Sequence, residues 1–236
     1  TEASIARYEE AVRNDPDNPD LQLELAIALL HAGRFDDMDV LLDGLIRKHP
    51  RTTRAYQLKA LGLRVRGLNA EALDPLANAI KLEPSEPINY IETASIHLRL
   101  GDQDKALDTL ESGLESTTNR LAIFHALGEI YLKEASDLAP LKDARLPSAP
   151  LEMLKLAAQE FPKDPYLLNQ YGDLLVLHGR MEDAIEVFAR IEELQPADLQ
   201  LRQKLAVSLV ALGDRKRAIE MLEDIADKRR NNHRLW

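Results

Sequence analysis

The chain of 236 residues has no cysteine, which excludes disulfide bonds, thiolate catalysis and cysteine-based zinc sites. Aromatic residues are only 5% of the chain, and no apolar run reaches the roughly 18 residues of a membrane-spanning helix. GxGxxG, GxSxG, P-loop and HExxH patterns are missing, and no two histidines lie four residues apart. We therefore expect no enzymatic activity, no metal and no cofactor. A soluble protein is expected, and the absence of cysteine does not distinguish the cytoplasm from the periplasm.

Five of the ten glycines recur at a fixed interval. They are Gly33, Gly67, Gly101, Gly179 and Gly213. Their intervals are 34, 34, 78 and 34 residues, and 78 is two intervals of 34 plus ten. Alanines and prolines recur in the same phase. A fixed period of this length predicts a stacked array of repeats, which offers an extended surface for binding.

Each repeat is predicted to form two helices. In residues 19–33 the apolar residues Leu21, Leu25 and Leu29 have helical spacing, and Gly33 supplies the positive φ that ends a helix. Asp36 and Asp37 then open a second helix, where acidic side chains complement the helix dipole.

Small and large residues alternate between the two helices in a way that favours stacking. The first helices carry a small residue near their middle, at Ala26, Ala60, Ala94, Gly128, Gly172 and Ala206. The second helices carry a bulky residue at one matching position, at Leu42, Leu76, Leu110, Leu154, Phe188 and Leu222.

This pattern resembles the tetratricopeptide repeat, a helix–turn–helix family with a 34-residue period. The fifth repeat matches best, with Tyr171-Gly172, Gly179, Ala184, Phe188 and Pro196 at the signature spacings. The resemblance implies an all-α fold, a right-handed α-solenoid of antiparallel helix pairs. About six repeats are expected, with partial repeats at both ends.

The chain is expected to form a single array over residues 1–236. Its repeats are 1–18 (partial), 19–52, 53–86, 87–120, 121–164, 165–198, 199–232 and 233–236 (partial). The repeat 121–164 holds a ten-residue insertion, placed between helices at residues 137–149, which either contacts a partner or is a neutral surface excursion. Because both ends read as partial repeats, we expect a fragment of a longer array.

Charge is unevenly distributed along the chain. The net charge is −10, which argues against duplex nucleic acid as the main partner. Residues 199–236 hold nine Lys or Arg against five Asp or Glu. This basic segment is either a solvated helix face or a docking patch for an acidic partner, including the acidic end of a second copy.

In the family that the chain resembles, ligands lie on the concave face lined by the first helices. Helical geometry predicts that this face holds the residues three before, one after and four after each small residue. Of the residues at these positions, those predicted to bind the partner are Leu23, Ile27, Gln57, Leu61, Arg64, Ile91, Ser95, His125, Glu129, Asn169, Asp173, Gln203 and Val207. Of the lysine and asparagine clamp with which some relatives grip chaperone C-termini, only Asn169 is found, so no terminal-carboxylate clamp is expected.

These features predict a protein–protein interaction scaffold that binds a peptide or an amphipathic helix of a partner in its groove. One alternative is a recruiting region, in the periplasm for instance, of a larger polysaccharide synthesis, export or secretion protein. A further alternative is a self-assembling scaffold.

Overall fold

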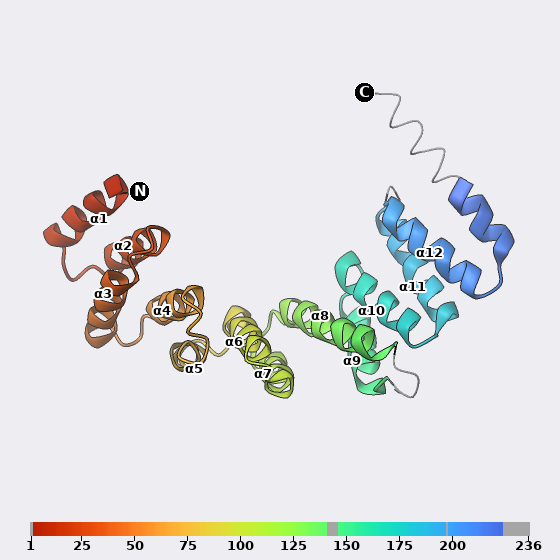
Figure 1. Ribbon diagram of the computed structural model, residues 1–236, viewed down its shortest axis with the longest axis horizontal. Helices are drawn as coiled ribbons and strands as arrows, with labels where there is room; N and C mark the ends of the chain where they lie inside the picture. Colours follow the sequence, from red (N-terminus) through yellow and green to blue (C-terminus); the bar gives the residue numbers. More distant parts are fainter. Residues whose placement is uncertain (1, 141–145, 197, 224–236) are drawn as a thin grey trace, which may run out of the picture. The chain divides into compact units, whose positions relative to one another are not determined.

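The computed structural model describes residues 2–140, 146–196 and 198–223, and within these ranges the chain forms helices and turns without any strand. The helices are α1 (Glu2–Asn14), α2 (Pro19–His31), α3 (Phe35–Lys48), α4 (Thr53–Val65), α5 (Leu73–Leu82), α6 (Pro87–Arg99), α7 (Gln103–Ser116), α8 (Arg120–Leu138), α9 (Ser148–Glu160), α10 (Pro165–Leu177), α11 (Met181–Leu194) and α12 (Leu199–Ala211) (Figure 1). Residues 215–223 are also helical. The all-α expectation is confirmed. No helix in these ranges has the length and apolarity needed to cross a bilayer.

The chain divides into two compact units, an N-terminal unit of residues 1–123 and a C-terminal unit of residues 124–236. In the N-terminal unit each helix from α1 to α6 packs against the next one along the chain. In the C-terminal unit the same holds from α9 to α12. Within each unit, therefore, helix pairs stack in sequence order, as a solenoid requires.

The five periodic glycines all have a positive φ, between 72° and 87°. Each follows a first helix, and the backbone after it closes onto that helix. The amide of Arg34 donates to the carbonyl of Leu29 at 3.0 Å, and the amide of Leu68 donates to that of Leu63 at 3.0 Å. This hydrogen-bond pattern ends a helix through a left-handed residue, so the turn prediction is confirmed.

Side chains and prolines fix where several first helices begin. The side chain of Asn18 accepts hydrogen bonds from two amides at the start of α2, and Asp198 does the same for α12. Asp164 accepts from the amide of Leu167 in α10 at 2.7 Å. These N-caps satisfy amide groups that have no partner within the helix.

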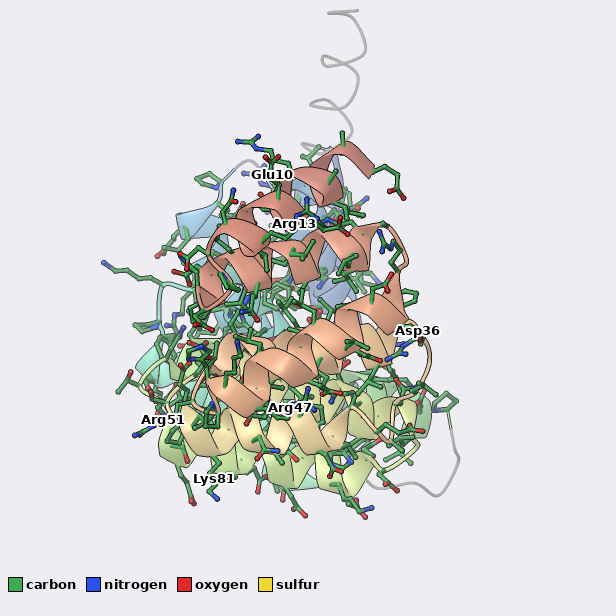
Figure 2. The ribbon with its side chains drawn as sticks, turned by 90° about the vertical axis from the view of Figure 1, so that its left-hand side faces the viewer. Glu10, Arg13, Asp36, Arg47, Arg51 and Lys81 are labelled. Atoms are coloured by element: carbon green, nitrogen blue, oxygen red, sulfur yellow. The ribbon has the colours of Figure 1, made fainter. Side chains whose placement is uncertain are left out.

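The core is built from the predicted small and bulky residues. Ala26 and Leu42 are fully buried, and Leu42 lies in one apolar cluster with Ala55 and Leu58 of the following first helix. The prediction for Leu222 is wrong, because 43% of its surface is exposed. The residues that would cover it, thirteen positions further on, lie outside the described ranges. Charged side chains such as Glu10, Arg13, Asp36 and Arg47 cover the exterior of the N-terminal unit (Figure 2).

The predicted insertion is shorter than its sequence suggested. Helix α8 continues to Leu138, and α9 already begins at Ser148, so both ends of the expected 137–149 loop are helical. Proline at 140 disfavours helix at the residue before it, which is consistent with the end of α8. Residues 141–145 lie outside the described ranges, as do residues 224–236 of the basic C-terminal segment.

Candidate functional site

The predicted partner-binding residues are not part of the buried core. Glu129 and Val207 are exposed, and the other eleven are half-buried. Leu23 and Ile27 pack against the edge of the core cluster formed by α1 to α4. The first helices therefore keep one face that is accessible to solvent.

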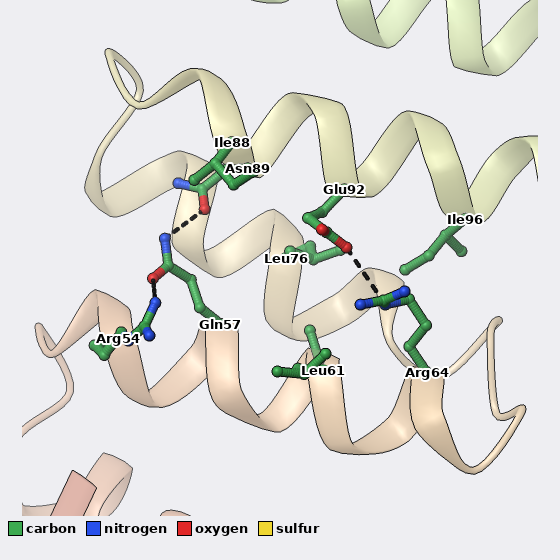
Figure 3. A pocket seen from close by; sticks show the side chains of 10 residues that line it. Arg54, Gln57, Leu61, Arg64, Leu76, Ile88, Asn89, Glu92 and Ile96 are labelled. Carbon is green, nitrogen blue, oxygen red and sulfur yellow. Dashed lines mark hydrogen bonds and ion pairs between the residues drawn. The ribbon is translucent and has the colours of Figure 1, made fainter. Parts of the chain in front are cut away.

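In the N-terminal unit a cleft of about 120 Å³ opens between α4 and α6. Three predicted residues line it from α4, namely Gln57, Leu61 and Arg64. Leu61 and Leu76 point into its middle, between two polar bridges that join the helices (Figure 3). The cleft is thus apolar at its centre and polar on both sides.

The first bridge is a chain of hydrogen bonds. The Nη1 of Arg54 donates to Oε1 of Gln57 at 3.4 Å. The Nε2 of Gln57 then donates to Oδ1 of Asn89 at 2.8 Å. This chain joins α4 to α6 and holds the Asn89 side chain, which is 1% exposed.

The second bridge is an ion pair. The Nε of Arg64 lies 3.4 Å from Oε2 of Glu92, and both side chains are partly exposed. The pair is not aligned as a hydrogen bond, so the buried Nε of Arg64 has no hydrogen-bond acceptor. The Nδ2 of Asn89 is also buried without an acceptor. The carboxylate of Glu92 faces the guanidinium of Arg64, so Nδ2 of Asn89 is the N–H group beside this cleft that has neither an acceptor nor an opposite charge.

The other predicted residues of the N-terminal unit do not join this cleft. Ile91 and Ser95 lie on α6 but are not among its lining residues, and Leu23 and Ile27 lie on α2. The structure thus brings together three of the seven residues predicted in this unit.

A second hollow of the N-terminal unit, about 380 Å³, lies among α3, α4 and α5. Lys59 and Asp43 form an ion pair there, and the hydroxyl of Tyr56 donates to the carbonyl of Pro50 at 3.1 Å. None of the predicted partner-binding residues lines this hollow, which makes it the weaker candidate for a binding site.

In the C-terminal unit, predicted residues of α8 contact polar and aromatic side chains at the start of α10. The hydroxyl of Tyr166 donates to Oε1 of Glu129 at 2.7 Å, and this hydrogen bond, with burial, raises the pKa of Tyr166. The ring of Tyr166 also meets the ring of His125 edge to face, with 4.8 Å between centroids. His125 in turn lies with Nε2 2.9 Å from Oδ1 of Asp164.

Lys204 of α12 closes a second cluster in the C-terminal unit. Its Nζ donates to Oδ1 of Asn169 at 2.7 Å and to the carboxylate of Asp173 at 2.7 and 2.5 Å. The ammonium also lies 6.0 Å from the centroid of the Phe188 ring. Asn169 and Asp173 are thus occupied by a residue of the same unit.

Several residues of these clusters were not among those predicted from the sequence. Glu92 and Lys204 have the same place in their repeats, two residues before Ala94 and Ala206. Each faces the preceding first helix, where it pairs with a predicted residue. This position was a recognisable signal in the sequence. The contributions of Arg54, Asn89 and Tyr166 depend on contacts between helices and carried no such signal.

Comparisons with known proteins agree with the helix-pair architecture. A tetratricopeptide repeat family model matches residues 1–62 and 178–236, and a second tetratricopeptide repeat model matches residues 151–198. Human "Protein IFIT1 homolog B" is 24% identical over 216 residues, which cover 86% of this chain. The "Photosystem I assembly protein Ycf3" of Prochlorococcus marinus (strain MIT 9303) is 34% identical over 103 residues, which cover 40% of this chain. The chain spans 44% and 59% of the lengths of these two relatives.

Solved structures share the fold at lower sequence identity. The C-terminal part of a TPR repeat-containing protein from Cytophaga hutchinsonii has a TM-score of 0.65 at 13% identity, covering 87% of this chain and 80% of that one. MamA (41-end) from Desulfovibrio magneticus RS-1 has a TM-score of 0.58 at 21% identity, covering 76% of this chain and 96% of that one.

Proposed function

Since the chain belongs to the tetratricopeptide repeat family, we propose that it is a protein-interaction scaffold that binds a peptide or helix of a partner on the faces of its first helices. One observation carries the proposal: the cleft between α4 and α6 combines an apolar centre with the exposed guanidinium group of Arg54. A groove of this kind can accept an apolar side chain together with a polar group of the segment that carries it.

The proposed mode of action is binding, without catalysis or a cofactor. The cleft is lined mainly by arginine, amide and aliphatic side chains, whose ordinary role is to position and hold a ligand. The net charge of −10 favours a protein partner over duplex nucleic acid.

A second candidate function is a recruiting region within a larger assembly or export system. It is favoured by the chain's partial coverage of its curated relatives, which contain further sequence. A solved structure of PilW, described as a type IV pilus biogenesis factor, has a TM-score of 0.57 at 14% identity and covers 88% of this chain and 91% of that one. At this identity PilW supports the fold, and the assembly role is a hypothesis.

Affinity capture with a matched pair of variants tests the scaffold proposal. Leu61→Lys places an ammonium in the apolar centre of the cleft. Val40→Lys makes a similar apolar-to-ammonium change on α3, where Val40 is 73% exposed. The baits are wild type and both variants, each first checked for helicity and melting temperature.

We expect a partner that wild type and Val40→Lys retain and that Leu61→Lys loses while remaining folded. A partner held equally by all three baits would contradict the use of this cleft. If capture depends on Val40 and not on Leu61, the partner binds the second helices instead.

A further inference from the structure

The cleft between α4 and α6 carries an excess of hydrogen-bond donors and positive charge. Arg54 and Arg64 contribute two guanidinium groups against the single carboxylate of Glu92. Arg54 is exposed and donates a hydrogen bond to the neutral amide of Gln57. Its charge is therefore not balanced by a carboxylate in the described part of the chain.

The orientation of the two amides in the first bridge follows from the chemistry of Arg54. A guanidinium group can only donate, so Gln57 must turn its oxygen towards Arg54 and its NH2 towards Asn89. Asn89 must then accept with its oxygen, which leaves its own NH2 without a partner. Arg54 thus determines that the unmet groups on this side of the cleft are donors.

The space between the bridges is suited to one aliphatic side chain. Leu61 and Leu76 lie between the bridges, and Ile96 lines the cleft beyond the Arg64–Glu92 pair (Figure 3). A volume of about 120 Å³ holds a few waters or a single side chain. Ile88 extends this apolar surface to the outside, where it is 44% exposed. Apolar surface of this kind favours burial of an aliphatic group from a partner.

We propose that the α4–α6 cleft recognises an internal peptide segment in which an aspartate or glutamate lies next to an aliphatic residue. The aliphatic side chain enters between the two bridges, and the carboxylate binds Arg54. This inference rests on the proposed scaffold function and adds the chemistry of the partner.

The test begins with a phage library of short random peptides selected on the whole chain. The enriched peptides are then synthesised with a fluorescent label, an acetylated or labelled N-terminus and an amidated C-terminus, so that no terminal carboxylate contributes. Their affinity is measured by fluorescence anisotropy for wild type and for Arg54→Glu, Arg51→Glu and Leu61→Lys.

Arg51→Glu is the matched control for Arg54→Glu. Both changes replace an exposed arginine near the start of α4, where an acidic side chain is compatible with the helix dipole. Arg51 projects from the edge of the molecule and does not line the cleft (Figure 2). A difference between the two variants therefore reports on the cleft and not on net charge.

The expected motif is an acidic residue beside Leu, Ile or Val, with affinity lowered about tenfold by Arg54→Glu and nearly unchanged by Arg51→Glu. Selection on Arg54→Glu should instead enrich lysine or arginine at the acidic position. Peptides that depend on Leu61 but have no acidic preference would overturn this inference and leave the scaffold proposal intact. Peptides indifferent to both Arg54 and Leu61 would contradict both. Competition by a single-stranded RNA oligonucleotide at lower concentration than the peptide would also overturn the inference.

Discussion

The two units of the chain share one repeat pattern, but the surfaces formed by their first helices differ. In the N-terminal unit, Arg64 on one first helix pairs with Glu92 on the next, and a cleft lined by the exposed guanidinium of Arg54 lies beside the pair. In the C-terminal unit the charges are reversed, with Asp173 on the first of the two helices and Lys204 on the second.

Lys204 binds Asn169 and Asp173 together, and Tyr166 binds Glu129, so these three predicted residues already have partners. The repeat therefore determines which positions face a neighbouring helix. The residue types at those positions decide whether the surface is open to a ligand or closed by internal contacts.

The core contact of Phe188 distinguishes the C-terminal unit most strongly. Phe188 is fully buried against Gly172, whereas the corresponding pair in the N-terminal unit is Leu76 and Ala60. Phe188→Ala should lower the free energy of unfolding by about 3–5 kcal/mol, because it removes a ring and leaves a cavity. Chemical denaturation followed by circular dichroism measures this loss. A loss smaller than that of Leu76→Ala would contradict the stronger packing assigned to Phe188.

The glycine opposite this ring gives a sharper test of the same contact. A Cβ added at Gly172 would collide with the Phe188 ring, so Gly172→Ala should cost about 1–3 kcal/mol. Adding Phe188→Leu creates the alanine–leucine pair of the other repeats and should recover part of that loss. If the double variant is less stable than the sum of the two single changes predicts, the size complementarity proposed for this pair is wrong.

The ion pair of Lys204 should matter less for stability than for the charge of the surface. The side chains of Lys204 and Asp173 are 38% and 34% exposed, so solvent screens the pair. Lys204→Met should therefore change the free energy of unfolding by at most about 1 kcal/mol. It leaves the C-terminal unit more acidic and does not touch the α4–α6 cleft. Peptide affinity at the cleft should therefore stay within twofold of wild type, and a large fall would show that the two surfaces are not independent.

The smallest expected effect is a pH dependence from His178, at the end of α10. Burial, together with the nearby charge of Arg180, lowers the pKa of His178 below its usual value of about 6.5. The folded state therefore takes up the proton less readily than the unfolded chain does. The stability contribution of this group is fully present above about pH 6.5 and is lost as the pH falls towards the folded pKa.

His178→Gln removes this dependence. The melting temperature of wild type should fall more between neutral and mildly acidic pH than that of the variant. Identical pH profiles would contradict the effect of burial on this histidine.

Much of the fold could be predicted because it depends on local chemistry. The positive φ of Gly33 and Gly67 and the carboxylate and amide caps follow from single residues and their immediate neighbours. The buried small and bulky residues follow from spacing alone. The exposure of Leu222 did not follow from its position in the repeat, and residues 224–236 lie outside the described part of the chain.

The site could be predicted only in part. Helical geometry placed Gln57, Leu61 and Arg64 on one face, and the structure brings them to one cleft. The unmet NH2 of Asn89 could not be predicted, since it follows from a hydrogen-bond chain that starts at Arg54 and crosses between two helices. Likewise, spacing put Asn169 and Asp173 on the groove face but did not reveal that Lys204 occupies both.

The measurement that tests the central claim most directly is a methyl NMR titration of the whole chain with the peptide selected above. Methyl signals of Leu61, Ile88 and Ile96 should shift with the same dissociation constant that fluorescence anisotropy gives. Signals of Val207 and Val210, which are exposed on α12, should stay unchanged. Shifts at Val207 and Val210 without shifts at Leu61, Ile88 and Ile96 would contradict the assignment of binding to the α4–α6 cleft.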